Sequence, residues 1–322
     1  MWSLSAVLVA VAAALAVLIV AWACGCAAVA AVSAAPRIPR CIIKAGPLPL
    51  EEMYKAAPST RRIYERTLAD NEGYEMFYYD DAACDAFMHA QFAECTHTTQ
   101  CGCARVWEAY RRLKPGAFRA DLFRYAHLYL YGGVWSDLTQ DFKVPLTDLV
   151  SDDDDAVIVR DKRQGNCMFR PGVQISFMCA PAGAPLMHAF MVTAVDNILR
   201  GDYGACPLAI TGPVSAAKAL RAGDFRYRCE LYQASENFIN SRVAKDAMQK
   251  PQRAIACRSK DHRAALGLPP ETTNGAYNSD WANRTSIGDP ADIRVSSGAV
   301  RVNVGTGAQE LVRQMPPSPK TV

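Results

Sequence analysis

The chain has 322 residues, of which 50% are hydrophobic and 21% are charged, and its formal net charge is +3. This near balance of charge argues against a dedicated nucleic-acid binder, which would concentrate Lys and Arg on one face. All 35 Lys and Arg and all 32 Asp and Glu follow Pro36, so residues 1–36 carry no charged side chain. The chain therefore divides into an apolar N-terminal segment and a polar segment that is long enough to bury its own core.

The N-terminal segment has the composition of a membrane-spanning helix. Val7 to Val32 are almost all apolar, and about 26 such residues suffice to cross the hydrocarbon layer of a bilayer. A cleaved signal peptide is the alternative, because Ala30 to Ala34 are rich in the small residues that a signal peptidase accepts. We favour an uncleaved anchor over residues 1–36, since the apolar run is longer than a signal peptide requires and no basic residue precedes it.

The orientation of this anchor is less clear from the sequence. Arg37, Arg40 and Lys44 follow the apolar run, and the positive-inside rule by itself would leave the rest of the chain in the cytoplasm.

The following residues alternate between strand and helix patterns. After a Pro-rich stem, we expect a strand at Cys41–Lys44, a helix at Leu50–Ala69, a strand at Glu75–Tyr79, and helices within 104–130 that break at Pro115-Gly116. We then expect strands at Val134–Ser136, Ala156–Val159 and Val173–Met178, and helices at Pro185–Leu199 and Val214–Ala222. This alternation predicts an α/β fold. From about Arg284 to Val322 the pattern weakens, which predicts a poorly ordered tail.

A small cluster of cysteines allows a metal site as a second interpretation. Cys95, Cys101 and Cys103 lie close together in the sequence with His97 between them, and thiolates and imidazole are zinc ligands. Because their spacing differs from the common Cys-x-x-Cys pattern, we favour a loop disulfide or buried thiols.

The densest functional signal lies in residues 117–146. Asp121 and Arg124 are three residues apart on a predicted helix and are therefore neighbours, although a surface ion pair would explain them equally well. Gly132-Gly133 should end this helix, since glycine tolerates a left-handed conformation. A short strand then places Asp137 at its carboxyl end, where α/β sheets bind ligands.

Three oxygen-bearing side chains follow that strand. If the chain stays extended, Asp137, Thr139 and Asp141 share one face because strand side chains alternate. Hard divalent ions such as Mg²⁺ and Mn²⁺ prefer oxygen ligands and often bridge to substrate phosphates. This pattern predicts a Mn²⁺ or Mg²⁺ site formed by the three residues.

These motifs resemble those of a known family. RADLFRYAHLYLYGGVWSDL (119–138) is similar to the signature of the DXD-containing sugar-binding glycosyltransferases, glycosyltransferase family 32, which includes Och1-type mannosyltransferases. Four shorter segments resemble other motifs of the family in the same order, namely RIPRCIIK (37–44), GYEMFYYDD (73–81), AITGP (209–213) and YNSDWANR (277–284). The resemblance implies a GT-A domain, Rossmann-like and nucleotide-sugar-binding, over residues 37–285, with 286–322 as the tail.

The resemblance also implies an activity and a location. Such an enzyme moves a hexose from a nucleotide-sugar donor to a glycan or glycolipid acceptor, with retention of configuration and with a divalent metal. An N-terminal anchor would hold it in the Golgi or ER membrane with the catalytic domain in the lumen. This disagrees with the positive-inside rule, and the sequence leaves the conflict open.

The family's motifs assign roles to particular residues. Asp121 and Arg124 would bind hydroxyls of the donor sugar, and Asp137 would contact the ribose and the sugar. Trp281, in the C-terminal motif, could stack on a sugar or a base of the substrate or could simply pack within the protein. The chain departs from the family at two positions. Thr139 replaces the second Asp of the DXD motif, which makes Asp141 the candidate substitute, and Ala276 lies in the C-terminal motif where the family has a His before the Trp.

Two alternatives stay open, one from these departures and one from the cysteine cluster. The first is a catalytically inactive relative that binds sugars or nucleotides without transferring them. The second is a membrane interaction protein stabilised by zinc at the cysteine cluster. No residue is assigned as a catalytic nucleophile, because the family has no agreed one.

Overall fold

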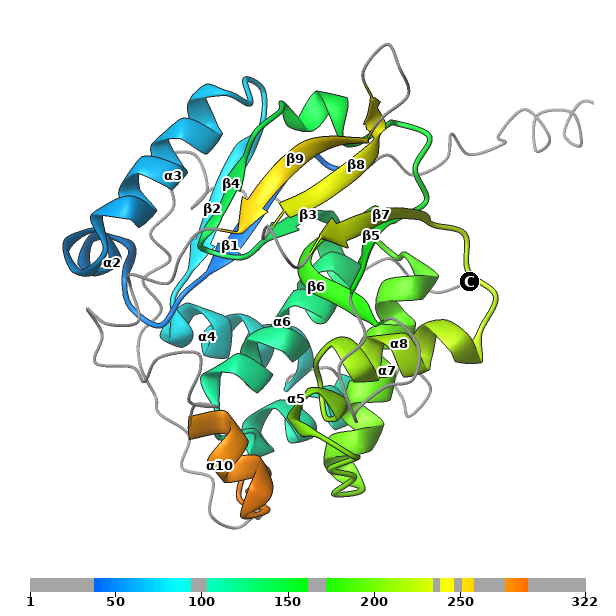
Figure 1. Cartoon of the computed structure of the whole chain (residues 1–322). Coiled ribbons are helices and arrows are strands. Elements are labelled where there is room, and N and C mark those ends of the chain that lie inside the picture. The colour runs from blue at the N-terminus through cyan, green and yellow to red at the C-terminus, as the bar shows by residue number, and fades with distance from the viewer. Residues whose placement is uncertain are drawn as a thin grey trace, which may run out of the picture. The chain divides into compact units, whose positions relative to one another are not determined.

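A computed structural model describes residues 38–93, 103–161, 172–233, 238–245, 251–257 and 276–288 (Figure 1). The strands are β1 (Cys41–Ala45), β2 (Glu75–Tyr79), β3 (Gly133–Ser136), β4 (Gln140–Phe142), β5 (Val157–Arg160), β6 (Val173–Ala180), β7 (Arg228–Gln233), β8 (Phe238–Lys245) and β9 (Pro251–Cys257). The α-helices are α2 (Leu50–Ala56), α3 (Pro58–Ala69), α4 (Asp81–Phe92), α5 (Cys103–Arg112), α6 (Gly116–Tyr131), α7 (Pro185–Leu199), α8 (Pro213–Ala222) and α10 (Ala276–Ala282). Two 3₁₀ turns, η1 (Leu146–Asp148) and η3 (Pro207–Ala209), complete the described elements.

Most of the predicted elements are present, and one predicted helix is divided. The residues predicted as one helix at Leu50–Ala69 form α2 and α3, which are separated by Ala57 in a non-helical conformation with φ −142° and ψ 87°. Pro58 causes this break, because the ring of a proline disfavours the helical conformation of the preceding residue. The break predicted at Pro115-Gly116 is confirmed, since it separates α5 from α6.

The strands form one mixed sheet in the order β2-β1-β3-β6-β5-β7-β8-β9-β4. β1 pairs in parallel with β2 and β3, and β5 pairs in parallel with β7, whereas the other neighbours are antiparallel. The α/β fold predicted from the alternation of elements is therefore confirmed at this level. The sequence did not predict β4 or the strands β7 to β9.

The sheet separates two hydrophobic cores because successive strand residues point to opposite faces. On one face Ile43 of β1 and Trp135 of β3 pack in the same core as residues of α4 to α8, which lie together below the sheet in Figure 1. On the other face Ile42 and Val134 share a core with Phe142 of β4. The sheet therefore curls so that its last strand, β4, packs against residues of β1 and β3.

Several predictions concern residues outside the described ranges. They include the membrane anchor at Val7–Val32, most of the cluster around Cys95 and Cys101, and the tail after residue 288. Among the residues that the structure does describe, no helix combines the length and the apolar character needed to span a membrane.

Candidate functional site at the end of strand β3

Helix α6 positions the predicted site, and the helix ends at a glycine. Most of its residues from Phe118 to Leu128 are buried, because α6 lies between the sheet and α7. Gly132 then adopts a left-handed conformation with φ +69°, as predicted, and a Cβ atom there would lie 2.6 Å from the backbone nitrogen of Ala182. Only glycine fits this turn, which leads the chain directly from α6 into β3.

Arg124 brings the three strongest sequence candidates together. Its guanidinium lies 3.1 Å from Oδ1 of Asp121 and donates a 3.0 Å hydrogen bond to Oδ1 of Asp137. It also donates to the backbone oxygen of Ile175 at 2.8 Å and lies 4.7 Å from the ring centroid of Trp135. Burial alone would lower the pKa of Arg124, but Asp137 and Asp121 hold that pKa above its usual value.

Asp121 is almost completely buried, and both of its carboxylate oxygens are engaged. Oδ1 faces Arg124, and Oδ2 accepts a 2.9 Å hydrogen bond from the hydroxyl of Thr211. Burial raises the pKa of Asp121 to about 6, although Arg124 and Thr211 both act to lower it. The structure therefore explains the AITGP motif, because its Thr211 closes over Asp121, and it leaves Asp121 covered by protein groups.

Asp137 is the most open of the three residues, with 41% of its side chain exposed. Its Oδ1 accepts hydrogen bonds from Arg124 and, at 2.9 Å, from the indole nitrogen of Trp135. Its backbone nitrogen donates to the oxygen of Ser176 at 2.9 Å. Among the described residues, Oδ2 has no hydrogen-bond partner. Asp137 is thus held by one oxygen and can offer the other to a ligand.

The expectation that the chain stays extended after Asp137 is wrong. The nitrogen of Gln140 donates to the oxygen of Asp137 at 2.9 Å, so the chain turns at Leu138 and Thr139. Asp137, Thr139 and Asp141 therefore do not share the face of one strand. The hydrogen bond between Gln140 and Asp137 favours the turn, because it pairs two backbone groups that an extended chain would leave to other partners.

The turn also removes Asp141 from the predicted metal site. Asp141 lies in β4, which pairs with β9, and its buried carboxylate is paired with Lys143 and with Arg66 at 3.6 Å. No group of three His, Cys, Asp or Glu residues in the described part of the chain is arranged to hold a metal ion. The pairing of Asp141 thus leaves Asp137 and the half-buried Thr139 as what remains of the predicted set of ligands.

Lys44 supports the turn from inside, although it was not among the predicted site residues. It is completely buried, and its ammonium donates to the hydroxyl of Ser136 and to the backbone oxygen of Asp137, both at 3.1 Å. Ser136 in turn donates to Gln140, whose amide donates to Ser176 at 2.7 Å. Burial lowers the pKa of Lys44 to about 7 against the opposing charge of Asp137. The signal was a single Lys in the apolar strand CIIKA.

Trp281 lies in a different set of contacts. Its indole nitrogen donates to the backbone oxygen of Tyr203 at 2.7 Å, and its half-buried ring packs against the core on the helix side of the sheet. The guanidinium of Arg284 lies 5.5 Å from the ring centroid of Trp281. The described contacts of Trp281 are therefore with the loop after α7 and not with Arg124 or Asp137.

Comparison with known proteins gives a family match and similarity to solved structures. No curated protein matches the chain. A solved structure described as PaToxG Glycosyltransferase is similar to it with a TM-score of 0.42 and 15% sequence identity, over 78% of this chain and 86% of that chain. Residues 58–154 match the family described as the glycosyltransferase sugar-binding region containing a DXD motif. This match includes α6, β3 and the turn after Asp137, so the chain contains a glycosyltransferase-like sugar-binding region.

Proposed function

We propose that this protein is a glycosyltransferase that moves a hexose from a nucleotide-sugar donor to a glycan or glycolipid acceptor. The observation that carries the proposal is the state of Asp137 within the matched region. One carboxylate oxygen is fixed by Arg124 and Trp135, while the side chain stays 41% exposed. A carboxylate oriented in this way can accept hydrogen bonds from the ribose and sugar hydroxyls of a donor.

The buried charges give Asp137 a defined orientation before a ligand binds. Arg124 holds its carboxylate, and Lys44 holds its backbone oxygen. Because these contacts lie in a poorly solvated region, they are stronger than the same contacts in water. The site would therefore lose little free energy to reorganisation when the donor enters.

The reaction that we propose retains the anomeric configuration of the sugar. The bond between the anomeric carbon and the leaving phosphate oxygen breaks, and the acceptor oxygen forms the new bond on the same face. The departing phosphate takes the proton of the acceptor hydroxyl. GT-A topology and a preference for mannose follow from the family resemblance of the sequence motifs and belong to the same proposal.

Divalent-metal dependence was expected from the DXD motif, with Mn²⁺ or Mg²⁺ as the ion. The predicted set of three ligands does not form, since Asp141 is paired with Lys143 and Arg66. We therefore assign no step of the reaction to a metal ion. The same observation favours a second candidate function, a relative that binds nucleotide sugars without transferring them.

One experiment tests both functions. UDP- and GDP-sugars are screened for turnover with and without Mn²⁺, and binding of each donor is measured by calorimetry. We expect turnover with at least one donor, and a loss of at least about a hundredfold in Asp137→Asn. Asp196→Asn is the matched control, because Asp196 is also a partly exposed Asp paired with an Arg, at 2.8 Å from Arg105. Donor binding without turnover would instead support the inactive relative.

We also propose that the domain is anchored by residues 1–36 and lies in the lumen of the Golgi or ER. The apolar N-terminal run supports the anchor, and the disulfide bond of Cys206 supports the lumen, because disulfides persist in oxidising compartments. Protection of the domain from protease in intact microsomes is the expected result. Digestion without detergent would place the domain in the cytoplasm, as the positive-inside rule alone suggests.

A further inference from the structure

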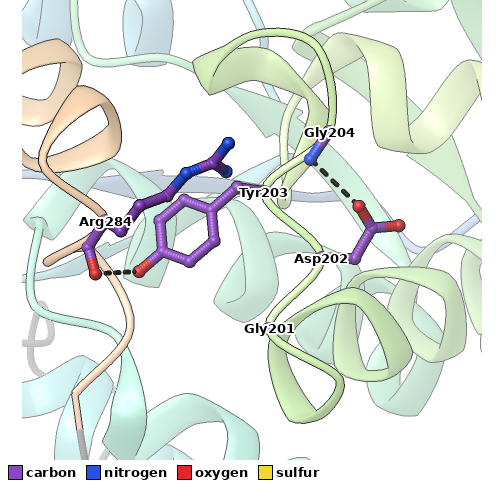
Figure 2. Close-up of a pocket in the computed structure, with 5 residues that line it drawn as sticks. All are labelled: Gly201, Asp202, Tyr203, Gly204 and Arg284. Atoms are coloured by element: carbon purple, nitrogen blue, oxygen red, sulfur yellow. Dashed lines mark hydrogen bonds between the residues drawn. The ribbon is translucent and has the colours of Figure 1, made fainter.

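A cavity of about 580 Å³ lies beside the loop that follows α7, and none of the roles above accounts for it. It is lined by Gly201, Asp202, Tyr203, Gly204 and Arg284 (Figure 2). Gly201 and Gly204 have φ values of +64° and +57°, so this stretch of the wall is bare backbone in a conformation that suits glycine. The cavity is therefore a shallow surface hollow, lined by the side chains of Asp202, Tyr203 and Arg284 and by the two glycines.

Arg284 is held over two aromatic rings at this cavity. Its guanidinium carbon lies 4.7 Å from the ring centroid of Tyr203 and 5.5 Å from that of Trp281. The hydroxyl of Tyr203 donates to the backbone oxygen of Arg284 at 2.7 Å, as Figure 2 shows, and accepts from the nitrogen of Ile287 at 3.1 Å. Stacking orients the plane of the guanidinium and leaves its N–H edge for a ligand.

The charge of Arg284 is not balanced within the described part of the chain, where no carboxylate lies within ion-pair distance of it. Arg284 is also the one residue other than glycine in those ranges with a positive φ, at +59°. Such a conformation is unfavourable for a residue with a side chain like that of Arg. A strained residue that presents an oriented, unpaired guanidinium to a cavity is a candidate for binding a carboxylate or a phosphate.

Asp202 supplies hydrogen-bond acceptors on another wall of the cavity. Its carboxylate accepts a 3.0 Å hydrogen bond from the nitrogen of Gly204 and lies 3.6 Å from the ammonium of Lys218. Because Lys218 balances the charge of Asp202, the cavity keeps the net positive charge of Arg284. Donors for an anion and acceptors for hydroxyls therefore line the same space.

The cavity is linked to the sugar-binding region through the chain. The loop that carries Gly201 to Gly204 continues through η3 to Thr211, whose hydroxyl donates to Asp121. The side-chain amide of Asn197 in α7 fixes the position of this loop, because it donates to the backbone oxygens of Ala209 and Ile210 at 3.0 Å. A ligand in the cavity would thus bind to the same loop that closes over Asp121.

We propose that this cavity binds a saccharide bearing a carboxylate or a phosphate, at a site separate from Asp137. Arg284 would bind the anionic group and Asp202 would accept hydrogen bonds from sugar hydroxyls. This binding does not depend on the proposed function.

The test measures binding of three probes to the full-length protein by calorimetry, without any donor. Glucuronic acid represents the carboxylate, glucose 6-phosphate the phosphate, and glucose the neutral sugar. We expect at least one anionic probe to bind about tenfold or more tightly than glucose. Which of the two binds more tightly identifies the anionic group of the natural ligand.

The variant Arg284→Asn removes the guanidinium while Asn tolerates the left-handed backbone. It should bind the preferred anionic probe no better than glucose. Arg61→Gln is the matched control, because Arg61 is likewise an exposed Arg stacked on a tyrosine, at 5.2 Å from the ring centroid of Tyr54. Its binding should equal that of the wild type.

A second variant tests the cavity without touching its charge. A Cβ atom at Gly201 would meet nothing within 4 Å, so Gly201→Asn places a side chain in open space at a left-handed position and should weaken anion binding. Equal binding of anionic and neutral probes, or wild-type binding by Arg284→Asn, would overturn the site. If binding depends on Arg284 but no nucleotide sugar is turned over, the site stands and the transferase proposal fails.

Discussion

Arg124 and His127 lie one helical turn apart on α6 and are both almost completely buried, yet their surroundings differ in kind. Arg124 is paired with Asp121 and Asp137, which keep it charged. His127 lies among the rings of Tyr79, Phe87, Phe123 and Tyr131, and burial lowers its pKa to about 3. The same degree of burial therefore makes one residue a fixed cation and the other a neutral packing group, and the nearest partners decide which.

Removing Arg124 should have the largest effect. Arg124→Met leaves the buried Asp121 and the partly exposed Asp137 without their shared cation, which should lower the free energy of unfolding by about 3–5 kcal/mol and abolish donor turnover. Denaturant unfolding and the turnover assay measure the two effects. Arg105→Met is the control, because Arg105 is exposed in its pair with Asp196 and should cost less than about 1 kcal/mol. Equal losses in the two variants would contradict the role given to Arg124.

The charge state of His127 can be tested through pH. Its pKa is lower in the folded than in the unfolded chain, so the unfolded state takes up a proton first as the pH falls. The contribution of His127 to the free energy of unfolding is thus fully present above pH 6.5 and is lost as the pH falls below that value. The loss is roughly 3 kcal/mol between pH 7 and pH 4.

His127→Phe should remove that part of the pH dependence. Its free energy of unfolding, measured by denaturant at each pH, should fall less steeply toward pH 4 than that of the wild type. A variant with the same slope as the wild type would show that the pKa of His127 is not lowered in the folded protein.

Binding of Mn²⁺ can test which side chains near the turn after Asp137 are able to hold a metal ion. Asp141→Ala should leave the affinity for Mn²⁺ unchanged, because Asp141 is paired with Lys143 and Arg66. Thr139→Asp adds a carboxylate at the half-exposed turn and should raise that affinity about tenfold. Electron paramagnetic resonance of free Mn²⁺ measures both without any donor. Weaker binding in Asp141→Ala would restore the predicted set of ligands.

The smallest effect is expected at Thr211. Thr211→Val keeps the shape of the side chain but removes the hydrogen bond that lowers the pKa of Asp121. The pKa of Asp121 should rise above 6, and the free energy of unfolding should fall by about 1 kcal/mol. Carboxyl NMR titration measures the pKa. A lower pKa in the variant would show that Thr211 does not donate to Asp121.

Local sequence determined much of what surrounds the site. Pro115-Gly116 separates α5 from α6, and Gly132 ends α6 and directs the chain into β3. The pairing of Asp121 with Arg124 follows from their spacing on a helix, which brings residues three apart to one face. These features depend on a few neighbouring residues, so a reader of the sequence can recover them.

Tertiary structure decided the rest. Asp141 was predicted to bind a metal ion together with Asp137 and Thr139. It lies instead in β4, which pairs with β9, a strand far along the chain that the sequence pattern did not reveal. Lys44 acquires its role only when β1 and β3 lie side by side and the sheet curls so that β4 packs against residues of both. The cavity at Arg284 likewise joins the loop after α7 to the segment after α10. Backbone periodicity specifies elements, but a buried charge is assigned by the groups that folding brings against it, because only those can replace the water that it loses.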